Sequence, residues 1–133
     1  ASIKCDLRGK DCVIIGASNI VGRPMAMELL NAGATVQVCH KETKDITQKS
    51  KSADVIIAAA GVANLVKSDW VKEGAVIIDV GINRLEDGTL AGDVDFDDVK
   101  DKVSAISPVP GGVGPMTIAV LLENTLTAYQ ARL

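Results

Sequence analysis

Two glycines that follow a short apolar run are the residues of this chain best suited to bind a phosphate. Gly16 and Gly22 frame a loop that includes Ala17, Ser18, Ile20 and Val21, and a helix-like segment follows. Glycine permits a tight turn and leaves no side chain in a ligand's way. We expect the first N–H groups of the helix to point outward unpaired, where the helix dipole also favours an anion. Ser18 stands where the dinucleotide fingerprint has its middle glycine, so an ordinary strand–helix turn is the alternative.

The segment after the second apolar run favours one nucleotide over another. A common NAD site has an acidic residue there, which accepts hydrogen bonds from the ribose 2′-hydroxyl. This chain has His40 and Lys41 instead, and a lysine pairs with a 2′-phosphate where a carboxylate would repel it. One such contact is worth about ten- to hundredfold in affinity, so we predict NADP. The alternatives are a solvated loop lysine and a histidine that neighbours the ribose or adenine or is simply structural.

Small residues also follow the next two apolar runs. Ala60 and Gly61 would let main chain approach a nicotinamide ribose, or they serve tight helix–sheet packing. Gly81 and Ile82 would expose main-chain groups to the nicotinamide carboxamide. Asp79, just before them, resembles a general base in isolation, but we favour a capping or hydrogen-bonding role.

A second glycine-rich loop runs over residues 108–115 and contains three glycines between prolines. Main chain alone would line any pocket beside it, and three glycines are more than a tight turn requires. Thr117 follows in the first turn of a helix, where its hydroxyl would reach a ligand. We find no Walker lysine loop, nucleophile elbow, metal-ligand cluster or carboxylate pair, so the residues support a binding module better than a self-contained active site.

Apolar runs alternate with helical or turn-rich segments along the whole chain. We expect strands over 11–15, 35–39, 54–59, 75–79 and 103–107. We expect helices over 23–32, 45–52 (capped by Asp45), 67–72 (capped by Ser68) and 96–102, and a last helix that starts at Pro115. The apolar face of this last helix holds Ile118, Leu121, Leu122, Leu126 and Tyr129. Asp87-Gly88 is a hairpin turn signal. The predicted fold is α/β, Rossmann-like and doubly wound, a mostly parallel sheet with helices on both faces and a small antiparallel hairpin.

The composition limits the class of protein. The chain has 133 residues, enough for one domain, with 47% hydrophobic and 2% aromatic residues and a formal net charge of −3. No basic stripe indicates nucleic acid, and no run is long enough to span a membrane. Three cysteines without metal-ligand spacing indicate free thiols in a reducing compartment, so we expect a cytoplasmic protein. The chain opens at Ala1, as a fragment or processed product would.

Four motifs together resemble the methylenetetrahydrofolate dehydrogenase/methenyltetrahydrofolate cyclohydrolase family. They are Gly16–Pro24, Asp79–Asn83, Gly92–Val94 and Pro108–Thr117, in the family's order. The resemblance covers residues 1–133 as the NADP-binding Rossmann domain alone, with residues 1–10 as the end of a connecting segment. It implies oxidation of 5,10-methylenetetrahydrofolate by NADP⁺ and hydrolysis of the methenyl product to 10-formyltetrahydrofolate, in a multifunctional, homodimeric enzyme of one-carbon metabolism and purine biosynthesis.

The resemblance also implies roles for single residues. Gly16, Ala17 and Ser18 would hold the cofactor phosphates, with Ile20 and Val21 in the same loop. Lys41 would lie beside the 2′-phosphate and Ile82 at the nicotinamide end, while Val113, Gly114, Pro115 and Thr117 would face the cleft shared with the folate.

One departure from the family pattern is large. The family's catalytic lysine belongs to an N-terminal domain that this chain lacks, so we assign no catalytic and no metal-binding residue here. A stand-alone, non-catalytic NADP-binding or regulatory module is the alternative. Another dehydrogenase of the same fold is disfavoured by the length and order of the motifs.

Overall fold

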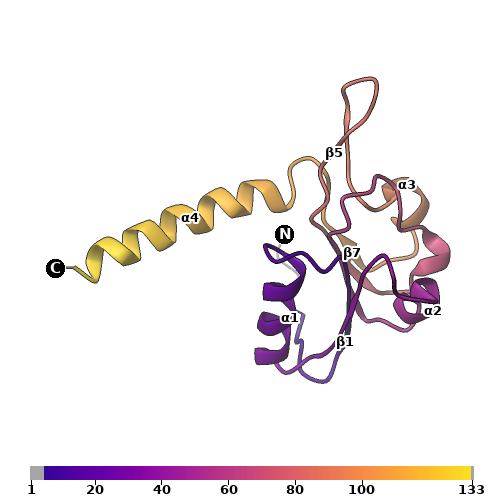
Figure 1. The fold of residues 1–133 in the computed structure, drawn as a ribbon, viewed down its shortest axis with the longest axis horizontal. Helices are drawn as coiled ribbons and strands as arrows, with labels where there is room; N and C mark the ends of the chain where they lie inside the picture. The colour runs from indigo at the N-terminus through magenta and orange to yellow at the C-terminus, as the bar shows by residue number, and fades with distance from the viewer. Residues whose placement is uncertain (1–4, 133) are drawn as a thin grey trace.

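Five parallel strands form the central sheet of the computed structural model, which describes residues 5–132 (Figure 1). They are β1 (Asp11–Ile15), β2 (Thr35–Cys39), β3 (Val55–Ala58), β4 (Val76–Asp79) and β7 (Ala105–Ile106), in the order β2-β1-β3-β4-β7. The predicted strands are confirmed, the last three being shorter than expected. Residues 1–4 of the predicted connecting segment lie outside the described residues, and Leu7 packs against the core beside β1.

Helices cover both faces of the sheet, as the pattern predicted. They are α1 (Gly22–Asn31), α2 (Ile46–Ser50), the 3₁₀ turn η1 (Ser68–Trp70) and α3 (Phe96–Val99), whereas the last helix, α4 (Val113–Gln130), buries no residue. Two predicted caps are wrong. Asp45 occupies the N-cap of α2 in the left-handed region at φ 55°, and its side chain makes no capping hydrogen bond. Ser68 lies inside η1, whose N-cap is Lys67.

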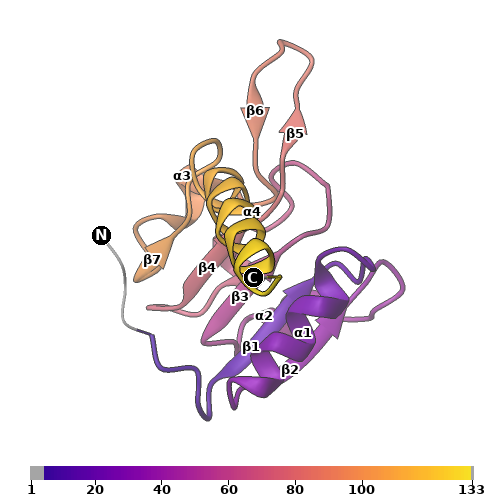
Figure 2. The same cartoon turned by 90° about the vertical axis from the view of Figure 1, so that its left-hand side faces the viewer.

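Two hydrophobic clusters lie on opposite sides of the sheet (Figure 2). On one side α1 buries Ala26 and Leu29 against Ile14 and Ile57. On the other side, Val71 and Val99 pack against Ile56, Ile77 and neighbouring strand residues. Buried strands with aliphatic side chains on both faces are what a parallel sheet requires, so nearly every core contact comes from Val, Ile, Leu and Ala.

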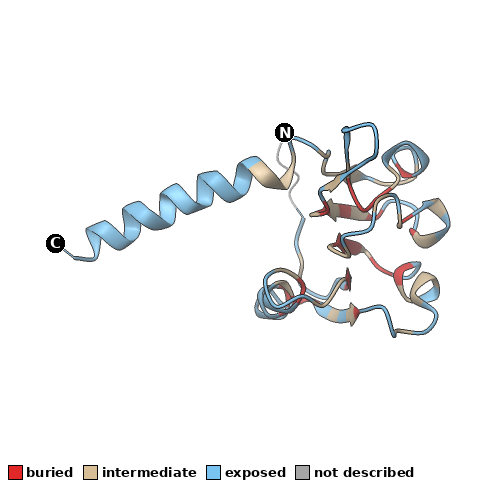
Figure 3. Cartoon of the chain, turned by 45° about the horizontal axis from the view of Figure 1, so that its top comes forward, coloured by how far each residue is buried: buried red, intermediate tan, exposed pale blue. Residues whose placement is uncertain are grey.

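The C-terminal helix α4 extends away from the domain (Figures 1 and 3). It contains no buried residue. The predicted apolar face is present but uncovered, because its five members are 56–66% exposed, namely Ile118, Leu121, Leu122, Leu126 and Tyr129. A helix with so much apolar surface exposed to water gains little stability from burial within residues 5–132.

A two-stranded hairpin projects from the sheet beyond β4 (Figure 2). Its strands are β5 (Asn83–Arg84) and β6 (Leu90–Ala91), paired antiparallel. Asp87 accepts hydrogen bonds from the Thr89 N–H and hydroxyl, which confirms the predicted turn. No helix within residues 5–132 is long and apolar enough to cross a membrane.

Candidate functional site

The carboxyl ends of β1 and β3 meet at the point where the strand order reverses, the usual ligand position in such sheets. Gly16 ends β1 there at φ +120°, and a Cβ on it would overlap the carbonyl oxygen of Ala59. A Cβ on Gly22 would in turn overlap the carbonyl oxygen of Gly16. Both glycines are therefore required by main-chain contacts, and the loop between them is held close to the sheet.

Ser18 closes the N-terminus of α1, which corrects the expectation of unpaired helical N–H groups. The N–H groups of Val21 and Gly22 donate to Ser18 Oγ at 3.1 and 3.5 Å, and that of Arg23 donates to the Ser18 carbonyl at 3.0 Å. The next residue, Pro24, has no N–H. Because Ser18 Oγ accepts these bonds, its own proton remains available to a phosphate oxygen. Within residues 5–132, the main-chain N–H groups of 17–20 have no acceptor, so the loop rather than the helix presents the donors.

Arg23 is a cation at this loop that the sequence reasoning missed. Its Nε donates to the carbonyl oxygen of Ala17 at 3.1 Å, which fixes the guanidinium beside the loop. The signal was its place in the first turn of α1, because helical side chains point back toward the N-terminus.

A cavity of about 760 Å³ lies beside the loop, and we call it the larger cavity. Polar and apolar residues line it together, namely Ile15, Gly16, Ala17, Ser18, Arg23, His40, Lys41, Glu42, Ile46, Ala59, Ala60, Val62, Leu65 and Trp70. Six predicted residues thus come together from the ends of β1, β2 and β3. The apolar lining residues Leu65 and Trp70 were not predicted.

The two polar residues after β2 are placed differently. Lys41 is exposed and lies 3.9 Å from Glu42, too far for a tight ion pair, so its ammonium group is free to turn toward a ligand. His40 is tied to its own loop, since its Nδ1 accepts a hydrogen bond from the Glu42 N–H at 3.3 Å.

A smaller cavity of about 370 Å³ lies at the ends of β4 and β7. Its lining contains the predicted residues Gly81, Ile82, Val113, Gly114, Pro115 and Thr117. Thr117 Oγ1 donates to the Val113 carbonyl at 3.2 Å, inside α4. Ile20, Val21 and Gly61 line neither cavity.

Two buried aspartates bind the main chain of the segments that border the two cavities. Asp79 accepts hydrogen bonds from the N–H groups of Gly81, Asp93 and Val94 at 2.9–3.0 Å, which confirms a hydrogen-bonding role. Burial raises the pKa of its carboxyl, and these hydrogen bonds oppose the shift. Asp93 is fully buried and accepts four hydrogen bonds from Ala60, Gly61, Val62 and Asn83. Its importance was hidden in the sequence, where Gly92-Asp93 served only the resemblance.

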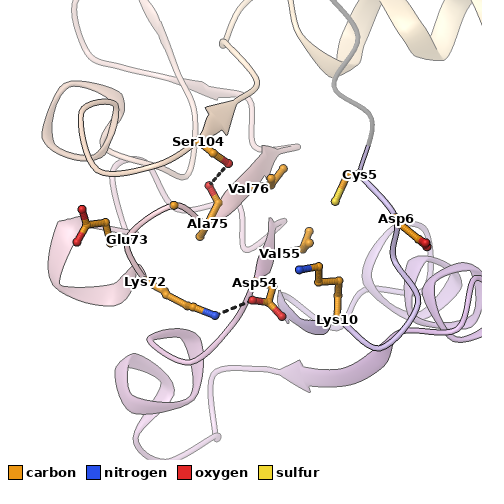
Figure 4. A pocket seen from close by; sticks show the side chains of 11 residues that line it. Cys5, Asp6, Lys10, Asp54, Val55, Lys72, Glu73, Ala75, Val76 and Ser104 are labelled. Carbon is orange, nitrogen blue, oxygen red and sulfur yellow. Dashed lines mark hydrogen bonds and ion pairs between the residues drawn. The ribbon is translucent and has the colours of Figure 1, made fainter.

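A third cavity, the amino-end cavity, lies at the opposite edge of the sheet and holds about 380 Å³ (Figure 4). Two of its charged groups, Lys72 and Asp54, pair with each other. Lys72 Nζ lies 2.6 Å from Asp54 Oδ1, and this hydrogen bond lowers the pKa of the Asp54 carboxyl. Ser104 Oγ donates to the Ala75 carbonyl at 3.1 Å.

A parallel sheet with a glycine turn, loop donors and cations at its switch point defines a nucleotide-binding Rossmann-like domain. The family model described as "Tetrahydrofolate dehydrogenase/cyclohydrolase, NAD(P)-binding domain" matches residues 1–133, and the chain belongs to this family.

Relatives named "Bifunctional protein FolD" are highly identical to this chain in sequence. "Bifunctional protein FolD" of Vesicomyosocius okutanii is 61% identical over 132 residues, which are 99% of this chain and 48% of that protein. The protein of the same name from Campylobacter jejuni strain RM1221 is 67% identical over 128 residues, covering 96% and 45%. The chain therefore spans about half the length of these relatives.

Solved structures agree with this fold. A Campylobacter jejuni FolD methylenetetrahydrofolate dehydrogenase/cyclohydrolase has a TM-score of 0.95 at 66% identity, over 96% of this chain and 45% of that one. The Trypanosoma brucei FolD complexed with NADP cofactor and inhibitor has a TM-score of 0.91 at 40% identity, covering 96% and 46%. Dipicolinate synthase A chain of Bacillus subtilis, at 18% identity and a TM-score of 0.65, shares the fold alone.

Proposed function

We propose that this chain binds NADP for a bifunctional folate enzyme. The whole protein would oxidise 5,10-methylenetetrahydrofolate with NADP⁺ and hydrolyse the methenyl product to 10-formyltetrahydrofolate. The observation that carries the proposal is the larger cavity at the switch point, which loop donors, two cations and apolar side chains line together. The NADP complex of the similar Trypanosoma brucei protein supports the choice of cofactor.

The larger cavity would hold the adenosine and phosphate part of NADP. The loop from Gly16 to Val21 would bind the pyrophosphate through main-chain N–H groups and the Ser18 hydroxyl. Lys41 and Arg23 would neutralise phosphate charge, Lys41 at the 2′-phosphate. His40 would border the ribose or adenine, whose flat base suits apolar lining residues such as Leu65 and Trp70.

The smaller cavity would hold the nicotinamide, which accepts a hydride from the methylene carbon of the folate. Gly81 and Ile82 would contact the carboxamide through main-chain groups. The N–H groups of Ala60 and Gly61 are already bound to Asp93, so their approach to the cofactor would use other main-chain atoms. Thr117 would contact the cofactor from α4, and residues 113–115 would border the folate.

The chemistry on the folate would need residues outside this chain. We assign no catalytic side chain here and expect the lysine of the cyclohydrolase step in a preceding domain. Two observations support such a partner, namely the uncovered apolar face of α4 and the doubled length of the relatives. A homodimer, a cytoplasmic location and a role in one-carbon metabolism and purine biosynthesis belong to the same proposal.

Titration calorimetry with NADP⁺ and NAD⁺ tests the cofactor assignment. We expect NADP⁺ to bind at least about tenfold more tightly, because only NADP⁺ offers a 2′-phosphate to Lys41. Equal affinities would contradict the choice of NADP. We also expect no NADPH at an enzymatic rate from the 133-residue chain with methylenetetrahydrofolate, and steady production would overturn the need for a second domain.

A further inference from the structure

The Asp93 carboxyl group lies at a place that solvent does not reach. Its side chain is fully buried, yet no cation pairs with it among residues 5–132. A buried carboxylate is costly unless hydrogen bonds replace its water. Four donors do so here, two for each oxygen, so the site is complete without any ligand.

Three of these donors are successive main-chain N–H groups. Those of Ala60 and Gly61 lie 2.5 and 2.8 Å from Asp93 Oδ2, and that of Val62 lies 3.0 Å from Oδ1. Consecutive N–H groups turned toward one anion form a nest, which has a definite main-chain shape. The carboxylate therefore determines the path of the loop after β3, which contributes Ala60 and Val62 to the larger cavity.

The fourth donor belongs to the segment that follows β4. Asn83 Nδ2 lies 2.8 Å from Asp93 Oδ1, at the start of β5 and directly after Gly81-Ile82 of the smaller cavity. Gly81 packs so closely on Asp93 that a Cβ there would overlap the carboxylate. One side chain thus joins the two segments that border the two cavities.

Asp79 keeps Asp93 itself in place. Its carboxylate accepts the N–H groups of Asp93 and Val94 at 3.0 Å and that of Gly81 at 2.9 Å. Gly92 lies against Asp79 with no room for a Cβ. The second aspartate therefore anchors the main chain that carries the first, at the end of β4.

We propose that Asp93 is a positioning residue that sets the separation between the two halves of the cofactor site. This inference rests on the proposed NADP binding. NADP spans both cavities and needs the larger and the smaller one at a fixed distance. A ligand that occupies the larger cavity alone, such as 2′,5′-ADP, has no such requirement. Asp93 thus acts on binding of the whole dinucleotide, without touching it.

Calorimetric titration of the full protein with NADP⁺ and with 2′,5′-ADP tests this role. Asp93→Asn keeps the shape but sets an NH₂ group against N–H donors. We expect its affinity for NADP⁺ to fall about 30-fold and its affinity for 2′,5′-ADP to change less than about threefold. Asp97→Asn, the same change at an exposed site four residues on, should leave both affinities unchanged.

A second variant covers the case in which Asp93→Asn does not fold. Asn83→Ala removes one of the four donors from a half-buried residue, and we expect about a fivefold loss for NADP⁺ with 2′,5′-ADP unaffected. Equal losses for both ligands in the folded variant would reduce Asp93 to a merely structural residue, and no loss for either would remove its role. Failure of the unmutated protein to bind either ligand would refute the proposed function instead.

Discussion

The carboxyl end of the sheet carries two cavities and two buried aspartates, and the amino end carries one cavity and the half-buried Asp54. At the carboxyl end, Asp79 and Asp93 are buried and accept main-chain N–H groups of the loops. At the amino end, Asp54 pairs with the side chain of Lys72, which is 48% exposed (Figure 4). The smaller cavity and the amino-end cavity have nearly equal volumes of about 370 and 380 Å³. Cavity volume therefore does not separate the two ends, whereas the partners of their aspartates do: main-chain N–H groups at the carboxyl end and a side-chain cation at the amino end.

The largest difference in NADP⁺ affinity between the two ends should come from replacing one glycine at each end with alanine. Gly16→Ala places a Cβ against the Ala59 carbonyl at φ +120°, so the loop must move, and we expect NADP⁺ affinity to fall more than about 100-fold. Gly74→Ala at the amino end has open space, and its φ of +75° costs about 1–2 kcal/mol of stability. Its NADP⁺ affinity should not change. Calorimetry measures the NADP⁺ affinity of both variants, and equal losses of affinity would contradict the predicted difference between the two ends.

A charge reversal at each end should have the next largest effect. Lys41→Asp replaces the cation expected beside the 2′-phosphate with an anion, so NADP⁺ should bind at least about tenfold more weakly. Lys10→Asp, in the lining of the amino-end cavity, is the matched control and should bind NADP⁺ normally. If titrations of the two variants agree, Lys41 is a solvated loop residue.

Removing one hydroxyl at each end sharpens the comparison further. Ser18→Ala deprives the Val21 and Gly22 N–H groups of their acceptor, which should cost about 1 kcal/mol of unfolding free energy and weaken NADP⁺ severalfold. Ser104→Ala loses a hydrogen bond to Ala75 with a similar stability cost and no effect on NADP⁺. Urea unfolding and calorimetry measure both quantities. An unchanged affinity in Ser18→Ala would limit Ser18 to capping.

The smallest effect is expected at the amino-end ion pair. Lys72 lowers the pKa of Asp54 below its ordinary value of 3.8, so ionised Asp54 stabilises the folded state above that pH. The contribution is lost as the pH falls through the lowered pKa. Asp54→Asn should therefore reduce the unfolding free energy by at most about 1 kcal/mol at pH 7, and this difference should shrink as the pH falls below about 4 and through the lowered pKa. A constant difference across this range would exclude the ion pair as its cause.

The sequence predicted those features that depend on neighbouring residues. Strands at 11–15 and 35–39 follow from short apolar runs that end in loop residues, and the hairpin follows from Asp87-Gly88. The loops at the carboxyl end follow from strand order, which explains why six predicted residues share the larger cavity.

Features that depend on distant residues or on one side-chain rotamer were missed. Asp93 reaches Ala60 across 33 residues of chain, and no local pattern reports such a contact. The Ser18 hydroxyl turned inward to cap α1, although the pattern suggested open helical N–H groups. The left-handed backbone of Asp45 removed an expected cap. Each correction concerns where a hydrogen bond goes rather than which element forms.

A crystal structure of the protein with NADP⁺ bound tests the central claim most directly. We predict the pyrophosphate against the N–H groups of residues 17–20, the 2′-phosphate within reach of Lys41, and the nicotinamide beside Gly81 and Ile82. NADP⁺ bound in the amino-end cavity, or absent from the carboxyl end at saturating concentration, would contradict the account.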